Sequence, residues 1–185
     1  MNFLEYAAQI QAIGREINPE TLKATRAIIE PLLDKSMLDG LKITRDLKYG
    51  NDERHRLDVF TDEGSKGIKP VLLFVHGGGF IAGDKHTEGS PFYSNIGAWA
   101  VKNGFTGVNM TYRLAPENPW PAGIEDIRAV VEWIKNKGED YGLDADRIFL
   151  MGQSAGGAHA AGYIAHSGIY GGADHGLAGA ILLSG

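Results

Sequence analysis

The 185-residue sequence contains no cysteine, so it can form neither a disulfide bond nor a thiolate metal site. This absence fits a reducing compartment, and we predict a cytoplasmic location for the protein. A basic cluster is also lacking, because 18 Lys and Arg residues are balanced by 23 Asp and Glu residues and the net charge is -5. We therefore expect no nucleic-acid partner.

Long hydrophobic runs are missing as well. The first ten residues, MNFLEYAAQI, have no basic stretch, and Glu5 interrupts their apolar residues, so they do not resemble a signal peptide. The uncharged stretch 151–173 is rich in Gly, Ser, Gln and His and is too polar for a membrane span. Glycine, by contrast, is abundant: its 26 residues concentrate at 77–79, around Ser154 and at 168–179, where tight backbone geometry is expected.

The first 40 residues have the apolar spacing of helices. Apolar side chains recur every three to four positions over 3–17 and again over 22–33. Asn18 followed by Pro19 indicates a helix N-cap with proline at the first helical position. We interpret residues 1–40 as a helical cap segment without catalytic chemistry.

The rest of the chain alternates strands and helices. The continuous apolar run Val71–Val75 is typical of a strand buried on both faces of a parallel sheet. Alternation of this kind implies βαβ units, so we predict one α/β domain over 41–185, with a mostly parallel sheet flanked by helices. We expect strands at 41–47, 55–60, 71–75, 106–112, 148–151 and 178–183, and helices at 92–102, over the apolar positions 124–134 and after Ser154.

The segment Gly152-Gln-Ser-Ala-Gly156 matches the pattern GxSxG between an expected strand and a small-residue helix. To project the Ser154 hydroxyl from the end of the sheet, the chain must reverse sharply, which strains the serine backbone. Side chains at Gly152 and Gly156 would collide in that turn, so we assign both glycines to a nucleophile elbow. The alternative is a flexible Gly/Ser loop without chemistry.

A second glycine-rich segment, His76-Gly-Gly-Gly-Phe80, directly follows the strand expected at 71–75. Consecutive glycines let the backbone present N–H groups to an oxyanion, and each such donor lowers the barrier to acyl transfer by about 3–4 kcal/mol. A phosphate-binding loop would need the GxGxxG spacing or the P-loop Lys-Ser/Thr, and both are missing. We interpret His76 and Gly77 as residues that support the shape of an oxyanion loop, and not His76 as a base.

Three motifs in this order, 76–80, the segment YRLAPENPWPA at 112–122 and 152–157, resemble the α/β-hydrolase carboxylesterases of the hormone-sensitive-lipase type. The resemblance covers about residues 41–185. It implies an α/β-hydrolase fold, a cap over the acyl pocket formed in part by residues 1–40, and catalysis without a metal or cofactor.

The resemblance also assigns roles to residues of the three motifs. It implies that Ser154 is the nucleophile and that the N–H groups of Gly78, Gly79 and Ala155 form the oxyanion hole. Arg113 and Glu117 would be structural anchors of the 112–122 segment. Gln153 departs from the family pattern, since many relatives carry an acidic residue at that position.

An Asp or Glu and then a His follow the serine in α/β-hydrolases. The residues after Ser154 are too few for the strands that would carry them, at about 30 residues per βαβ unit. His159 would point about 140° away from Ser154 on its helix, and His175 would lie at the opposite edge of the sheet. We expect His55 and His166 at the surface.

His86 could line the pocket but would be an unprecedented base in this family. We therefore expect the chain to be the N-terminal portion of a larger esterase, with the triad Asp and His outside it. The isolated chain would be inactive or weakly active. Its last strand, 178–183, would expose an apolar sheet edge that can pair with another chain or with the missing portion.

Together these features predict a serine hydrolase that cleaves small-molecule carboxylic esters, with short to medium acyl chains, through an acyl-enzyme. Because a fold does not fix an activity, two alternatives stay open. The first is a non-catalytic ligand-binding receptor on the same fold, and the second is an arylformamidase or lactonase.

Overall fold

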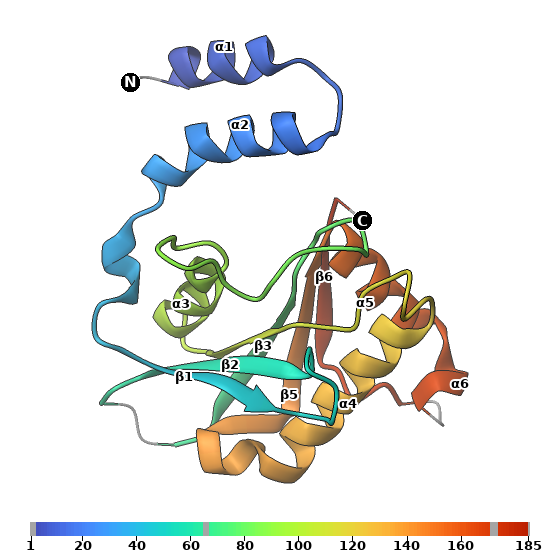
Figure 1. Ribbon diagram of the computed structural model, residues 1–185. Coiled ribbons are helices and arrows are strands. Elements are labelled where there is room, and N and C mark those ends of the chain that lie inside the picture. The colour runs from blue at the N-terminus through green and yellow to red at the C-terminus, as the bar shows by residue number, and fades with distance from the viewer. Residues whose placement is uncertain (1–2, 65–66, 171–173, 185) are drawn as a thin grey trace.

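A computed structural model describes residues 3–64, 67–170 and 174–184, and part of the glycine-rich stretch at 168–179 lies outside this range. Its centre is a six-stranded sheet with the order β1-β2-β4-β3-β5-β6 (Figure 1). The strands are β1 (Leu41–Lys48), β2 (Arg56–Asp62), β3 (Lys69–Val75), β4 (Thr106–Met110), β5 (Leu143–Gln153) and β6 (Gly179–Leu183). All six strands predicted from the sequence are confirmed.

The sheet is mixed but mostly parallel. β3 pairs in parallel with both β4 and β5, and β5 pairs in parallel with β6. β1 and β2 form an antiparallel ribbon that joins the sheet at β4. Since the parallel strands end at one edge, the loops after β3, β4 and β5 meet there.

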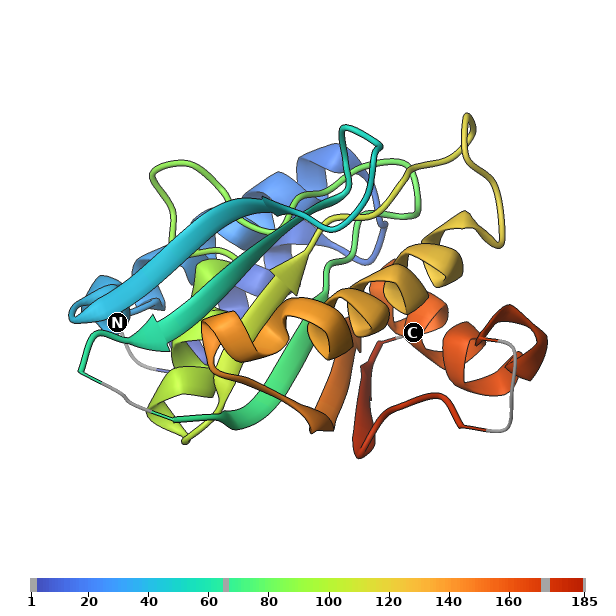
Figure 2. The ribbon, with the colours of Figure 1, turned by 90° about the horizontal axis from the view of Figure 1, so that it is seen from below.

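Helices cover both faces of the sheet (Figures 1 and 2). Val71, Leu73 and Val75 pack into one core with Ile124 and Ile127, while the alternate residues of β3 face the other side. The helices of the sheet domain are α3 (Ser94–Lys102), α4 (Ala122–Lys137), α5 (Ala155–Ala165) and α6 (Ser167–Tyr170), and a short 3-10 helix, η3 (Gly138–Tyr141), precedes β5.

On its own face, α3 lies unusually close to the sheet. A Cβ atom on Gly107 of β4 would lie 2.7 Å from the Cα atom of Gly97, and a Cβ atom on Gly97 would lie 2.3 Å from the Phe60 ring. Both glycines are therefore required for the packing of this helix. The predicted α/β architecture is confirmed on both faces.

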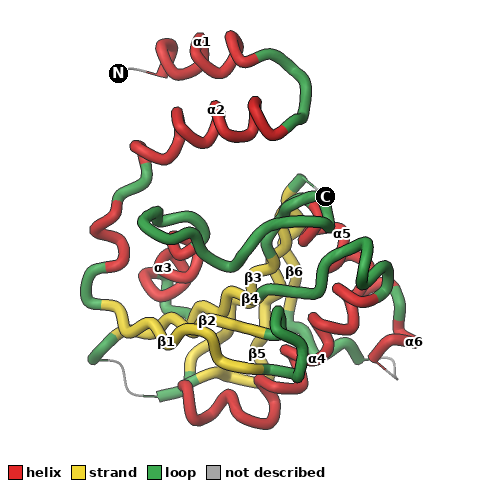
Figure 3. Tube along the Cα trace, viewed as in Figure 1, coloured by secondary structure: helices red, strands yellow, loops and turns green. Residues whose placement is uncertain are grey.

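The N-terminal helices α1 (Phe3–Ile13) and α2 (Pro19–Ile29) stand apart from the sheet, and the long loop between β3 and α3 lies on the same side of it (Figure 3). Neither helix contains a buried residue. The predicted N-cap is confirmed, because the Asn18 side chain accepts a hydrogen bond from the Thr21 N–H at 2.9 Å. Two 3-10 turns, η1 (Glu30–Leu32) and η2 (Lys35–Leu38), lead into β1. No helix within the described ranges is long and apolar enough for a bilayer.

Candidate active site

Ser154 occupies the junction between β5 and α5 with backbone angles φ 53° and ψ -122°. These angles are strained for a residue with a side chain, as the elbow interpretation requires. A Cβ atom on Gly152 would lie 2.3 Å from the Gly156 carbonyl oxygen, and one on Gly156 would lie 2.2 Å from the Val75 carbonyl oxygen. The turn can therefore be this tight only with glycine at both positions.

The oxyanion loop starts where β3 ends, so it lies beside the elbow. Gly78 and Gly79 have φ of 134° and 61°, and Phe80 also has a positive φ of 69°. A Cβ atom on Gly78 would lie 2.0 Å from the Ala82 carbonyl oxygen. The N–H groups of Gly78, Gly79 and Ala155 donate no hydrogen bond to another described residue, which leaves them available to a ligand.

His76 is fully buried beneath this loop. Burial lowers the pKa of His76 to about 4, so its ring is neutral near pH 7. The Nδ1 atom lies 2.6 Å from the Gly77 carbonyl oxygen, which it can reach only as a donor. Nε2 is then the acceptor that faces the Arg54 guanidinium at 3.4 Å. This is the geometry of a residue that fixes the loop, and it leaves His76 no free nitrogen for a base.

Two further residues hold the loop from below. The Tyr112 ring stacks on His76 at 4.5 Å, and its hydroxyl donates to the His76 carbonyl oxygen at 3.1 Å. Arg54 donates to the carbonyl oxygens of Tyr112 and Gly83, at 2.7 and 2.9 Å. Sequence reasoning missed Arg54, because it comes from the β1–β2 connection, far from every motif.

Gln153 links the elbow to the loop. Its Oε1 atom occupies the space where a Cβ atom of Gly77 would stand, at 2.4 Å, and it accepts a hydrogen bond from the Tyr93 hydroxyl at 3.3 Å. Burial raises the pKa of Tyr93, which keeps this hydroxyl protonated as a donor. Gln153, which departs from the family pattern, is therefore an uncharged side chain that packs between the elbow and the oxyanion loop.

The 112–122 segment is anchored by Asp126 of α4. Its buried carboxylate accepts hydrogen bonds from the backbone N–H and the Nε atom of Arg113, at 2.7 and 2.8 Å. His55 Nε2 adds a third contact with Asp126 at 3.1 Å. Arg113 is thus confirmed as an anchor, whereas Glu117 is exposed and forms no hydrogen bond or ion pair with another described residue. The expectation for Glu117 is wrong, because Asp126 and Glu125 pair with the arginine instead.

All six histidines of the sequence lie in the described part of the chain, and none forms a hydrogen bond with the Ser154 hydroxyl. His159 is buried between Phe80 and Tyr112, and His86 faces Asp58 with its Nδ1 atom 3.7 Å from the carboxylate. His166 is exposed against Trp120, as expected.

His55 corrects a prediction, since it lies half-buried in the contact with Asp126 instead of at the surface. His175 precedes β6, and its Nδ1 atom accepts from the Leu177 N–H at 3.0 Å. No group of three His, Asp or Glu residues in the described ranges could hold a metal ion. Because none of the six histidines forms a hydrogen bond with the Ser154 hydroxyl, the described residues provide no histidine base for this serine.

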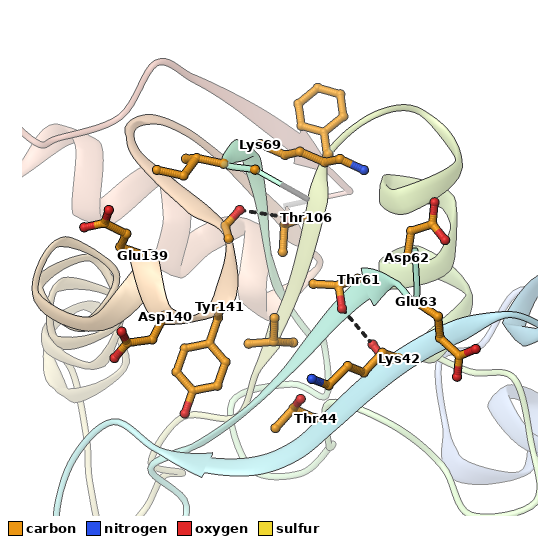
Figure 4. A pocket seen from close by; sticks show the side chains of 15 residues that line it. Lys42, Thr44, Thr61, Asp62, Glu63, Lys69, Thr106, Glu139, Asp140 and Tyr141 are labelled. Carbon is orange, nitrogen blue, oxygen red and sulfur yellow. Dashed lines mark hydrogen bonds between the residues drawn. The ribbon is translucent and has the colours of Figure 1, made fainter. Parts of the chain in front are cut away.

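A polar hollow of about 430 Å³ lies at the other edge of the sheet (Figure 4). Lys69 and Thr106 stand at the starts of β3 and β4, and Thr106 donates to the Gly142 carbonyl oxygen at 3.2 Å. Because Ser154 follows the end of β5, this hollow is separated from the elbow by the length of the parallel strands. It takes no part in the candidate site.

The model of the BD-FAE family matches residues 57–169, which is more than half of the chain. The chain belongs to the BD-FAE family. Among curated proteins it is similar to Esterase LipI of Mycobacterium tuberculosis, with 45% identity over 93 residues that cover 50% of this chain and 28% of LipI. It is also similar to the versiconal hemiacetal acetate esterase of Dothistroma septosporum, with 29% identity over 81% of this chain and 45% of the relative.

Solved structures show the same fold. A thermostable esterase from Pseudomonas putida has a TM-score of 0.70 at 24% identity, over 97% of this chain and 55% of that structure. A bacterial heroin esterase has a TM-score of 0.63 at 29% identity, over 91% of this chain and 54% of that structure. The resemblance to α/β-hydrolase carboxylesterases is thereby confirmed, and the chain spans less than half the length of the two curated relatives.

Proposed function

We propose that the protein carrying this chain is a serine hydrolase that cleaves carboxylic esters through an acyl-enzyme. The observation that carries the proposal is Ser154 in a strained turn, beside a loop in which the N–H groups of Gly78 and Gly79 donate to no other described residue. The esterase names of the relatives support the same reaction class. The preference for short to medium acyl chains and the cytoplasmic location remain predictions.

In the proposed reaction, the Ser154 hydroxyl oxygen attacks the ester carbonyl carbon, and the carbonyl electron pair moves to its oxygen. The N–H groups of Gly78, Gly79 and Ala155 stabilise this oxyanion, each by about 3–4 kcal/mol. Collapse of the intermediate breaks the bond to the alcohol, which leaves with the proton taken from Ser154. Water then cleaves the acyl-enzyme and restores the hydroxyl.

A base has to carry that proton, and the described histidines do not reach Ser154. We propose that the base and its carboxylate partner come from a part of the protein outside these 185 residues. In the same protein, residues 1–40 would form part of a cap and residues 41–185 the first portion of the catalytic domain. The outer edge of β6, a strand whose apolar side chains Ile181, Leu182 and Leu183 are exposed, would pair with the remaining portion.

Replacement of the serine tests this proposal. In the protein that carries the complete site, Ser154→Ala should reduce hydrolysis of 4-nitrophenyl acetate by a factor of about 10⁴ or more. It should also abolish labelling by a fluorophosphonate, measured by intact mass. Ser36→Ala, at an exposed serine in η2, is the matched control and should retain both signals. A wild-type protein that is neither labelled nor active would instead support the ligand-binding receptor.

A further inference from the structure

An apolar pocket of about 390 Å³ lies directly beside the candidate site. Phe80 is the last residue of the oxyanion-loop segment, Ala158 lies one helical turn after Ser154 in α5, and Trp120 lies near the end of the anchored 112–122 segment. The N–H of Ala115 donates to the Phe80 carbonyl oxygen at 3.0 Å, which ties the two walls together. The volume is within the range of small-molecule sites, about 300–1,000 Å³.

The walls of this pocket are unusually aromatic for a surface. Phe80 is 42% exposed and Trp120 is 65% exposed, although both are large apolar side chains. The Phe80 ring rests edge-on against buried His159 at 5.1 Å, so its position is fixed from below. Exposed aromatic rings that converge on one hollow mark binding sites for flat apolar groups.

The charges around the pocket are already compensated. The Arg113 guanidinium, which lines it, lies 2.7 Å from Asp126 and 3.0 Å from Glu125. His159 at its base is neutral near pH 7, because burial lowers the pKa of this ring. An anionic group that enters the pocket would therefore lose its hydration without gaining an unpaired cation among the lining residues. A neutral group has little hydration to lose.

We propose that this pocket binds a neutral aromatic ring of the ester substrate, with Phe80 and Trp120 as its specificity-determining walls. The proposal rests on the proposed esterase function and narrows the substrate class to esters that carry a neutral aromatic group. The ring can belong to the alcohol or to the acyl part, since the pocket adjoins both the oxyanion loop and the helix that follows Ser154.

Two pairs of substrates distinguish a ring in the alcohol part from a ring in the acyl part of the ester. The first compares phenyl acetate with ethyl acetate, and the second compares methyl benzoate with methyl acetate. For each pair, the ratio of kcat/KM values is measured for the wild type, Trp120→Ala and Phe80→Ala, so that intrinsic reactivity cancels between proteins. We expect the ratio in at least one pair to fall on the order of 10-fold in both variants. The pair that responds identifies the part of the ester that carries the ring.

Trp99→Ala is the matched control, because Trp99 lies on α3 and is also exposed, at 47%. Its ratios should stay within about twofold of the wild type, which is the scatter expected for a surface substitution. Ratios in Trp120→Ala and Phe80→Ala that match those of Trp99→Ala would overturn the proposal.

A direct binding measurement keeps this test separate from the proposed function. Titration with 2-naphthol, a neutral aromatic alcohol, should shift the indole N–H resonance of Trp120, assigned by its absence in Trp120→Ala. The resonance of Trp99 should not shift. If the protein hydrolyses no ester, a saturable Trp120 shift still supports the pocket, and the absence of a shift refutes it. If esters are hydrolysed but the ratios and the resonance stay unchanged, only the pocket proposal fails.

Discussion

The elbow and the oxyanion loop are both glycine-rich turns at the same edge of the sheet, but they are held in different ways. At the elbow, Gly152 and Gly156 exclude side chains because backbone carbonyl oxygens lie within 2.3 Å of the positions of their Cβ atoms. The loop has one such contact, since a Cβ atom on Gly78 would lie 2.0 Å from the Ala82 carbonyl oxygen, whereas a Cβ atom on Gly79 would meet no atom of the described residues within 4 Å. Unlike the elbow, the loop is also held by buried and half-buried polar side chains, those of His76, Tyr112 and Arg54.

The loop should therefore be sensitive to changes of charge and of polar partners that do not affect the elbow. A turn fixed by backbone contacts responds to added volume, because the sheet and helix on either side cannot yield. A turn fixed by buried polar side chains responds to protonation and to loss of a partner. The predictions below test whether the two turns differ in this way.

The largest effect should follow Gly156→Ala. Its Cβ atom would press on the carbonyl oxygens of Val75 and His76, at 2.2 and 2.6 Å, so the elbow and the start of the loop must move apart. Overpacking of this kind costs about 1–3 kcal/mol or more. We expect a fall in Tm of about 5–10 °C, measured by circular dichroism, and, in the protein that carries the complete site, loss of fluorophosphonate labelling at Ser154.

Gly64→Ala provides the control, because a Cβ atom at this turn would have no neighbour within 4 Å among the residues that the structure describes. It should change Tm by no more than about 2 °C, as an unconstrained surface substitution does. If Gly156→Ala proved as stable as Gly64→Ala, the close backbone contact at the elbow would not govern this turn.

Acidification should weaken the loop. Because burial holds the pKa of His76 at about 4, below its ordinary value of 6.5, the unfolded chain binds a proton that the folded chain excludes. The stabilising contribution of neutral His76 is therefore complete above pH 6.5 and is lost as the pH falls from 6.5 toward 4. Over this window the free energy of unfolding should decrease by on the order of 3 kcal/mol, measured by urea titration.

The variant His76→Asn should remove most of that pH dependence. His166→Asn, at an exposed ring, should leave it in place. Buried His159, whose pKa is also lowered by desolvation, contributes in the same direction, so some pH dependence should remain in His76→Asn. A pH dependence in His76→Asn equal to that of the wild type would show that protonation acts elsewhere than at the loop.

The two turns also differ in how well the sequence predicts them. Ser154 and its flanking glycines could be predicted because the strain is local: strand, turn and helix follow one another directly in the chain. The strands could be predicted for the same reason, since continuous apolar runs such as Val71–Val75 mark buried strands without reference to any distant residue.

The supports of the loop could not be predicted in this way. Arg54 reaches Gly83 across 29 positions of the chain, and Tyr93 reaches Gln153 across 60. Charged and polar residues at exposed-looking positions carry no local sign of such partners. The same limit explains Glu117, which lies inside a recognisable motif, whereas the residue that anchors this motif, Asp126, lies outside it.

The smallest expected effect concerns strain at Ser154. With φ at 53°, a glycine at this position would relieve about 1–3 kcal/mol of backbone strain but would give the unfolded chain about 0.5–1 kcal/mol of extra freedom. Ser154→Gly should therefore be about 1 kcal/mol more stable than Ser154→Ala, which keeps the strain and also lacks the hydroxyl. Urea titration of the two inactive variants measures this difference. If the alanine variant were equally stable, the elbow would be held by its glycine contacts without stored strain at the serine.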